Sequence, residues 1–89
     1  MNLDISKIQK ILEKLKRRNF ALFRALQKKI NQIAEMDVIS INHFKNLRHD
    51  LSYLKRVQIG SFVLVFRVKD NTIIFEDFDH HDRIYKNKN

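Results

Sequence analysis

The polar string near the end of the chain holds the side chains best suited to chemistry. It reads Asp79-His80-His81-Asp82-Arg83-Ile84-Tyr85. Histidine titrates near neutral pH, arginine grips phosphate oxygens in a planar fork, and tyrosine can stack on an unpaired base. Metal-free cleavage of RNA needs a base for the 2′-hydroxyl, an acid for the leaving 5′-oxygen and cations at phosphorus. The string therefore contains the ingredients of a site that cleaves or holds RNA.

Two other interpretations of the same string stay open. It could be a solvated polar tail that does no chemistry. It could also bind a metal, because Asp79, His80, His81 and Asp82 are all ligand types. Adjacent residues of a strand point to opposite faces, however, so His80 and His81 are not expected to share one ion. We therefore expect no metal and no cofactor.

The charge of the chain narrows the choice of partner. With 18 Lys and Arg against 10 Asp and Glu, the net charge is +8 over 89 residues. Such a field favours polyanions, of which nucleic acid is the commonest and an acidic protein segment the next. A lysine-rich surface that serves solubility is the alternative. The chain has no cysteine, no recognisable signal peptide and no long apolar run, so we expect a cytoplasmic protein without disulfides or membrane association.

Three β-rich runs must position the polar string. They are separated by the turns Gly60-Ser61 and Lys69-Asp70-Asn71, and they span residues 55–59, 62–68 and 72–78. Runs of this kind predict an antiparallel meander. Gly60 is the only glycine and stands where a tight hairpin needs positive φ. The apolar middle run predicts a strand covered on both sides or lying beneath a substrate groove.

Side-chain alternation assigns faces to the first of these strands. Val57 and Ile59 should face a helical layer, whereas Arg56 and Gln58 should share the opposite face. Lys55 is in phase with the apolar pair, so it should lie at the strand's end or at an irregularity.

The N-terminal part predicts a short strand within residues 1–5 and then two helices. Asp4 or Ser6 could cap the first helix, and Asn19 could cap the second, which should end near Met36. Apolar residues at helical spacing give each helix one buried stripe. The first stripe consists of Ile8, Ile11, Leu12 and Leu15, and the second of Leu22, Phe23, Leu26, Ile30, Ile33 and Ala34. We expect Phe20 to be in the core as well.

These elements predict an α+β fold in which an N-terminal αα-hairpin packs on a small, mainly antiparallel β-sheet. One domain should cover residues 1–89, with the short strand and hairpin in 1–36 and the sheet and C-terminal segment in 37–89. Residues 37–50 have no clear period. Apolar residues there should anchor the segment to the core: Val38, Ile39, Ile41, Phe44 and Leu47.

The whole chain resembles the RelE/ParE toxin superfamily. The resemblance is carried by Ser6-Lys7, Lys45-Asn46-Leu47, the run from Arg56 to Phe62, Val65-Phe66 with Val68, and the closing string. The family commonly has an Arg-x-Arg-apolar-Gly-Asp-Tyr-Arg run, which is similar to Arg56-Val57-Gln58-Ile59-Gly60-Ser61-Phe62. Its closing His-Arg-x-x-apolar-Tyr signature is similar to His80-His81-Asp82-Arg83-Ile84-Tyr85.

The resemblance implies a β-α-α-β-β-β order and one of two activities. RelE-type members cleave mRNA in the ribosomal A site, without a metal, through basic residues of the sheet and a C-terminal tyrosine. ParE-type members inhibit DNA gyrase. Both are neutralised by a cognate antitoxin, so the resemblance implies a RelB-like antitoxin, the ribosome and mRNA as partners, and a heteromeric toxin–antitoxin complex.

Arg56, His80 and Tyr85 match residues of the family motifs, but three positions depart from them. Gln58 and Val63 stand where arginines are usual, and His81 replaces the arginine of His-Arg. We hypothesise that His81 serves as acid or base, Arg56 as phosphate clamp and Tyr85 as a stacking or orienting group, with His80 beside them. The cations expected to hold RNA phosphates are Lys45, Arg48, Lys55, Arg67 and Arg83. The alternatives are a ParE-like inhibitor that binds by shape and a degenerate toxin that binds only its antitoxin.

Overall fold

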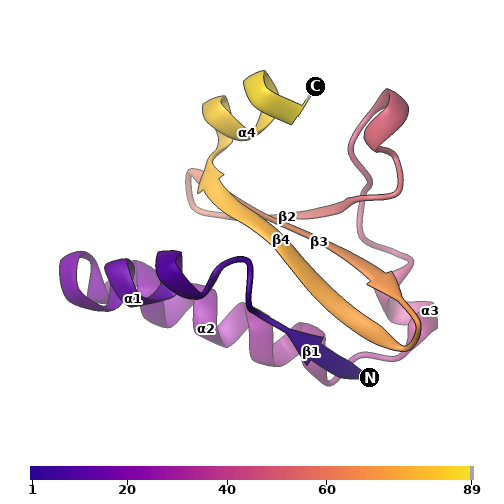
Figure 1. Ribbon diagram of the computed structural model, residues 1–89, viewed down its shortest axis with the longest axis horizontal. Helices are drawn as coiled ribbons and strands as arrows, with labels where there is room; N and C mark the ends of the chain where they lie inside the picture. The colour runs from indigo at the N-terminus through magenta and orange to yellow at the C-terminus, as the bar shows by residue number, and fades with distance from the viewer. Residues whose placement is uncertain (89) are drawn as a thin grey trace.

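The computed structural model describes residues 1–88, with the side chains of residues 49, 87 and 88 excepted (Figure 1). The elements, in chain order, are β1 (Asn2–Asp4), α1 (Gln9–Arg18), α2 (Phe20–Ala34), α3 (Val38–Ile41), the 3₁₀-helix η1 (His49–Leu51), β2 (Lys55–Ile59), β3 (Phe62–Lys69), β4 (Thr72–His80) and α4 (His81–Lys88). The predicted β-α-α-β-β-β order is confirmed, with three short helices added to it. None of the helices in the described part is long and apolar enough to cross a membrane.

The four strands form one mixed sheet with the order β1-β4-β3-β2. β2 pairs with β3 and β3 with β4 in antiparallel fashion, and the short β1 runs parallel to β4. Gly60 has φ +60 in the two-residue turn between β2 and β3, as predicted. Asp70 and Asn71 both have positive φ in the next turn, a conformation that these two residue types tolerate better than most.

The αα-hairpin of α1 and α2 covers one face of the sheet (Figure 1). Both predicted stripes point into this layer, where Ile8, Leu26 and Ile33 are fully buried against Leu64 and Phe66 of β3. Asn19 caps α2 as predicted, since its side-chain oxygen accepts a 3.2 Å hydrogen bond from the Leu22 N–H. Val57 and Ile59 of β2 face the same layer.

A second, smaller core covers the other face of the sheet. Val63 and Val65 of β3 pack there against Leu47 and Leu54 of the loop before β2 and against Ile84 of α4. All five side chains are at most 4 % exposed. Because alternate residues of β3 are buried in different cores, the middle strand is covered on both sides. This outcome confirms the first of the two expectations for that strand.

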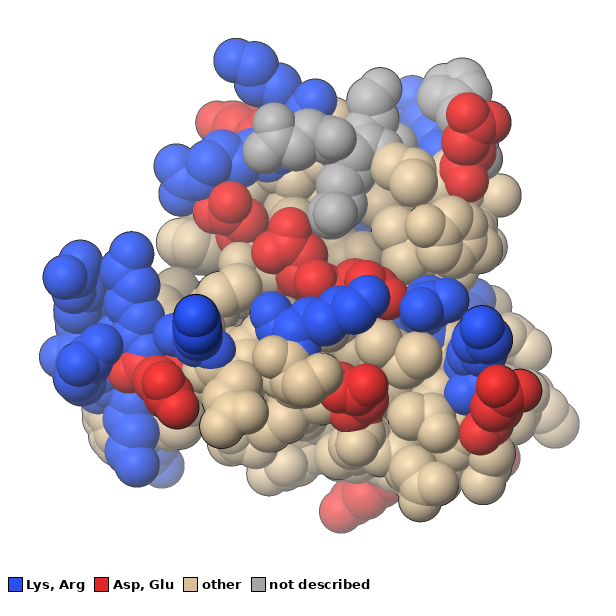
Figure 2. Space-filling view, viewed as in Figure 1, with Lys and Arg blue, Asp and Glu red and all other residues tan. Residues whose placement is uncertain are grey.

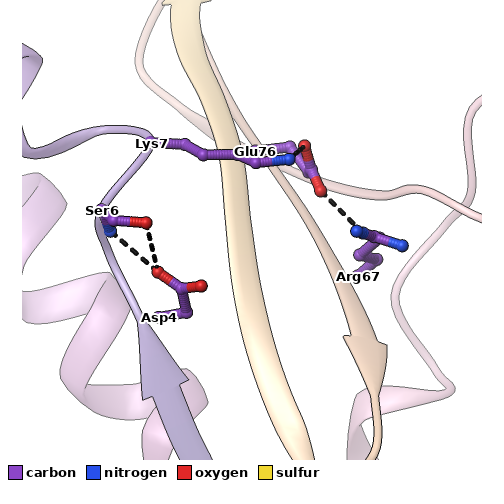
Figure 3. A network of polar contacts seen from close by, with 5 residues as sticks. All are labelled: Asp4, Ser6, Lys7, Arg67 and Glu76. Carbon is purple, nitrogen blue, oxygen red and sulfur yellow. Dashed lines mark hydrogen bonds and ion pairs between the residues drawn. The ribbon is translucent and has the colours of Figure 1, made fainter.

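Several predictions about individual residues were wrong. Phe20 is 54 % exposed and stacks on Phe23, because it starts α2 directly after the turn that joins the two helices, at the tip of the hairpin. Ile8, rather than Asp4 or Ser6, occupies the N-cap of α1; Asp4 instead accepts two hydrogen bonds from Ser6 in the turn before the helix (Figure 3). α2 ends at Ala34, near Met36 as predicted.

The segment after α2 is also more regular than expected. Asp37 caps the single turn of α3 by accepting the Ser40 N–H, and this turn directs Ile41 into the hairpin-side core. Val38 and Ile39 lie on the outer side of the turn, 55 % and 73 % exposed, so they do not anchor the segment. Of the predicted anchors, Ile41, Phe44 and Leu47 are confirmed.

A bulge in β4 places one acidic residue between two cations. The register with β3 shifts between Val65 and Phe66, which leaves Glu76 without a partner across the pair. Its carboxylate accepts hydrogen bonds from Arg67 Nε at 2.6 Å and from Lys7 Nζ at 2.7 Å (Figure 3). This network ties the segment before α1 to the middle of the sheet.

Candidate functional site

The first group of candidate residues is a pair that joins β2 to α4. Arg56 Nη1 donates a 2.5 Å hydrogen bond to Tyr85 Oη, and the guanidinium carbon lies 5.5 Å from the centroid of the tyrosine ring. The arginine therefore both hydrogen-bonds the phenol and lies within cation–π range of the ring. Both side chains are half-buried. The structure thus brings two of the candidate site residues, Arg56 and Tyr85, into direct contact.

This pair lines a hollow of about 410 Å³ together with Asn46, Leu47 and Arg48. Residues 45–47, in the loop before β2, are held against the outer edge of that strand by two backbone hydrogen bonds. The Arg56 N–H donates to Lys45 O at 2.8 Å, and the Leu47 N–H donates to Leu54 O at 2.9 Å. Asn46 Oδ1 accepts a hydrogen bond from Lys55 Nζ, so the amide NH₂ remains as a donor. The hollow thus presents a guanidinium, a phenol and an amide, groups that bind phosphate and base edges.

Three further candidates meet where β4 gives way to α4. His80 is the last residue of the strand and His81 the first of the helix, and their ring centroids lie 4.7 Å apart. Asp82 Oδ1 lies 2.7 Å from His81 Nδ1. The backbone N–H of Asp82 donates a 3.2 Å hydrogen bond to His80 Nδ1. The expectation that the two histidines point to opposite faces was wrong, because the chain leaves the strand conformation between them.

The two histidines have different surroundings. His80 pairs with Phe62 across the strands and presents its ring to that phenylalanine, on the face of the sheet that the αα-hairpin covers. His81 begins α4, one turn before Tyr85. Side chains four positions apart on a helix are neighbours, with Cβ atoms about 6 Å apart. His81 therefore shares a helix with Tyr85, but its ring lies next to that of His80, and neither histidine is among the described residues that line the hollow.

The two positions where the family usually has arginine are occupied differently. Val63 is 1 % exposed and lies in the core beneath Ile84 of α4. Gln58 is exposed on the neighbouring strand, directly across from Val63, and donates to the Gly60 carbonyl at 2.9 Å. Position 63 is therefore buried under the C-terminal helix, whereas position 58 is open to solvent.

The cations predicted to hold phosphate are spread around the sheet. Arg48 lines the hollow, and Lys45 and Lys55 flank it at the paired edge of β2. Lys55 starts its strand, as predicted. Arg67 is bound to Glu76 at the bulge. Arg83 donates to Asp79 and lines a different hollow that faces α1, so the structure does not bring these two arginines to the Arg56–Tyr85 pair.

Two acidic residues of β4, Asp77 and Asp79, accept hydrogen bonds from the strand's own backbone. Beyond Ile74 no strand covers this edge within the described part, and the N–H groups of Phe78 and His80 donate to Asp77 Oδ1 and Asp79 Oδ1, each at 2.8 Å. Burial raises the pKa of Asp79, but its bonds to Arg83 and the His80 N–H outweigh that effect and hold the pKa below the usual range. The free edge is thereby closed to strand pairing.

Sequence reasoning did not select Asn46 and Leu47 as site residues. The signal was present, since Lys45-Asn46-Leu47 is one of the motifs that carry the resemblance. Their position became visible only in the backbone pairing of residues 45–47 with β2.

Comparisons with known proteins bear on the fold and the family of the chain. No family model matches the chain. A protein of Methanocaldococcus jannaschii named "Putative toxin RelE4" is 50 % identical over 84 residues, which cover 91 % of this chain and 85 % of that one. An uncharacterized protein of Methanosarcina mazei is 35 % identical over 83 residues, covering 90 % of this chain and 92 % of that one.

The crystal structure of the toxin–antitoxin complex RelBE2 from Mycobacterium tuberculosis superposes with a TM-score of 0.66. The match covers 91 % of this chain and 90 % of that chain at 19 % identity. The chain is thus a small basic α+β protein with the RelE fold, in which an αα-hairpin packs on a four-stranded mixed sheet. The identity to the archaeal relative carries the assignment further: the chain belongs to the RelE toxin family.

Proposed function

We propose that this protein is the toxin of a toxin–antitoxin system and that it cleaves mRNA bound to the ribosome without a metal. The observation that carries the proposal is the Arg56–Tyr85 pair, which lines a surface hollow together with Asn46 and Arg48. A guanidinium and a phenol held together at 2.5 Å offer a charge and a hydroxyl to one phosphate group. Arg48 and Asn46 add a second cation and an amide donor on the same wall.

Each member of the pair has a distinct role. The hydroxyl of Tyr85 accepts from Arg56, so its own proton remains to donate to an RNA oxygen. The remaining N–H groups of Arg56 clamp the non-bridging oxygens as negative charge develops at phosphorus. Because both groups are half-buried and already bonded to each other, little ordering is needed when RNA arrives.

His81 supplies proton transfer. Asp82 accepts from its Nδ1, which leaves Nε2 as the nitrogen that can take up or release a proton. We infer that an imidazole one helical turn before Tyr85 can reach a phosphate bound by Arg56 and Tyr85, because side chains four positions apart on a helix are neighbours. Arg56, Tyr85 and His81 therefore provide the clamp, the donor and the base that cleavage at a 2′-hydroxyl requires.

The charge distribution supports binding to ribosomal RNA. Figure 2 shows Lys and Arg crowded over the end of α1, whose last turn contains Lys16, Arg17 and Arg18. Cations in such number neutralise phosphates without reading sequence. The RelBE2 toxin was solved in complex with its antitoxin, and we infer that this chain likewise has a cognate antitoxin partner in the cytoplasm.

Cleavage in a reconstituted translation reaction tests the proposal. The purified chain is added to message with and without ribosomes, and cuts are mapped by primer extension. We expect cuts only with ribosomes, and a loss of at least about tenfold in rate for His81→Ala and for Tyr85→Phe, since one preorganised donor is worth that much or more. Wild-type rates in both variants would refute the roles assigned to His81 and Tyr85.

A binding toxin is the second candidate, and one observation favours it. The two usual arginine positions hold a buried Val63 and an exposed Gln58, and Arg67 is bound to Glu76. Fewer cations than usual would then stabilise the phosphorane. Expression in cells separates the candidates: translation arrest supports the nuclease, filamentation with DNA damage supports a gyrase inhibitor, and no phenotype supports a disarmed relative.

A further inference from the structure

The junction between β4 and α4 brings together three side chains that can bind a metal: His80, His81 and Asp82. Each offers one ligand atom, and these atoms all lie within 4.8 Å of one another. We propose that this His-His-Asp cluster is a binding site for Zn²⁺, with the fourth coordination position left to water.

The backbone sets up the cluster before any ion arrives. The change from strand to helix at His81 turns the two rings toward each other, with an angle of 38° between their planes. The His81 N–H donates to Ser61 O at 2.9 Å, which fixes the first turn of α4 to the β2–β3 turn. The His80 ring contacts Phe62 in an edge-on arrangement at 5.6 Å. Both histidines are thus positioned by groups outside the cluster.

The ligand set suits zinc. Zn²⁺ binds imidazole nitrogen and carboxylate oxygen at about 2.0–2.2 Å, often with three protein ligands and one water. Ligand atoms of a tetrahedral site at such bond lengths lie about 3.4 Å apart. The cluster must therefore contract by little more than 1 Å at its widest, relative to its 4.8 Å spread. Its side chains are 34 %, 43 % and 76 % exposed, so rotation about their side-chain bonds can provide this.

The local charge also favours a cation, although the chain as a whole is strongly basic. Figure 2 shows a row of acidic side chains along β4 toward the base of α4, where the sequence has Asp77, Asp79 and Asp82. The cation of the first turn of α4, Arg83, is held by Asp79 through a 2.8 Å hydrogen bond. Its guanidinium is therefore paired with a carboxylate outside the cluster.

Zinc at this site would act on the proposed nuclease. It would occupy the imidazole of His81, which could then no longer take up or release a proton. It would also link the last residue of β4 to the first turn of α4. The expected consequence is a reversible loss of cleavage when zinc is bound, and this consequence rests on the proposed function.

Metal binding is measured first, on the untagged full chain, by competition with a chromophoric zinc chelator. We expect one Zn²⁺ per chain. His80→Ala, His81→Ala and Asp82→Asn should each weaken binding at least about tenfold, since each removes a ligand or its charge. His43→Ala is the matched control, because His43 is exposed in the turn after α3, and it should bind like the wild type. Absence of binding at about 100 μM zinc would overturn the proposal, because the dissociation constant of any zinc complex would then have to lie above about 100 μM.

A spectrum of the imidazole nitrogens identifies the ligands in the unmodified chain. On addition of zinc, the resonances of His80 and His81 should shift and those of His43 should not. Binding with unchanged His80 and His81 resonances, or undiminished binding in a folded His80→Gln/His81→Gln variant, would place the ion elsewhere and overturn the proposal.

The cleavage assay tests the consequence separately. Zinc should suppress cleavage by at least about tenfold, and a chelator should restore it. Zinc binding with undiminished cleavage would refute the regulatory role and leave the site in place. A chain with no nuclease activity at all would contradict the proposed function, whereas the binding measurements would still decide the zinc site.

Discussion

Arg56 on β2 contacts Tyr85 on the C-terminal helix α4 in two ways. Arg56 Nη1 donates a 2.5 Å hydrogen bond to Tyr85 Oη, and the guanidinium carbon lies 5.5 Å from the centroid of the tyrosine ring. The two residues are 29 positions apart in sequence. The contact therefore has two functions. It orients two groups of the proposed site, and it adds a polar tether to the apolar docking of α4.

A double-mutant cycle measures this tether. Arg56→Lys removes the planar fork, and Tyr85→Phe removes the hydroxyl but keeps the ring. We expect a coupling free energy of about 1 kcal/mol between the two changes, since a half-buried hydrogen bond to a charged donor contributes about that much. The free energy of unfolding of the four proteins is measured by urea denaturation. Strictly additive effects would show that the two side chains do not interact in solution.

Ile84 provides the apolar part of the docking. It is 1 % exposed in the core formed with Val63, Val65, Leu47 and Leu54. Ile84→Ala should lower the free energy of unfolding by about 2–4 kcal/mol, because it removes buried methylene groups and leaves a cavity. Cleavage should fall as well, since α4 carries both His81 and Tyr85. Ile39→Ala is the control, because Ile39 is 73 % exposed and its change should stay within about 0.5 kcal/mol.

Equal effects of Ile84→Ala and Ile39→Ala would contradict the packing of α4 on the sheet. Circular dichroism of the variants distinguishes local release of the helix from global unfolding. Local release should leave the rest of the sheet and the αα-hairpin intact.

The sheet and the hairpin could be predicted because their signals are local. Alternation and turn residues place β2 and β3 almost to the residue, and the apolar stripes identify which faces of α1 and α2 are buried. The C-terminal helix could not be predicted in this way. Its eight residues contain one buried apolar side chain, Ile84, which gives no period, and its docking depends on Val63 and Val65 about twenty residues earlier.

The sequence indicates which residue types could form the candidate site, but it does not show which of them touch. The contact between Arg56 and Tyr85 is visible only in the structure. His80 and His81 would point to opposite faces only in a continuous strand, and the helix that begins at His81 interrupts the strand between them. Val63 could be recognised as a missing arginine from the sequence alone. That it is a core residue under Ile84 follows only from the tertiary structure.

Replacing Val63 by arginine should lower the stability of the protein, whereas replacing Gln58 by arginine should leave stability nearly unchanged and raise the cleavage rate. Val63→Arg would bury a charge beneath Ile84 without a partner, and it should cost about 3 kcal/mol or more of stability. Gln58 is exposed directly across the strand pair from Val63, so Gln58→Arg should change stability by about 0.5 kcal/mol or less. The added cation lies on the face of the sheet that carries Arg56, and it should raise the rate of mRNA cleavage. Urea denaturation and the translation assay measure the two effects, and a lower cleavage rate in a stable Gln58→Arg variant would contradict the proposed location of the phosphate.

Glu76 should give stability that disappears in acid. Burial raises the pKa of its carboxyl, but the hydrogen bonds and charges of Lys7 and Arg67 outweigh burial and hold the pKa below the usual 4.5. A carboxyl whose pKa is lower in the folded state stabilises the fold above its unfolded pKa, and this stabilisation is lost as the pH falls through the folded pKa. Glu76→Gln should therefore lower the free energy of unfolding by about 1–2 kcal/mol at neutral pH, because it removes two charge-assisted hydrogen bonds.

The difference between wild type and Glu76→Gln should be constant above pH 4.5 and should shrink progressively at lower pH. Urea denaturation over a range of pH values measures it. Glu35→Gln is the matched control, since Glu35 is exposed at the end of α2 and its replacement should have little effect at any pH. A difference that persists unchanged in strong acid would mean that Glu76 stabilises the bulge by its shape and hydrogen bonding rather than by its charge.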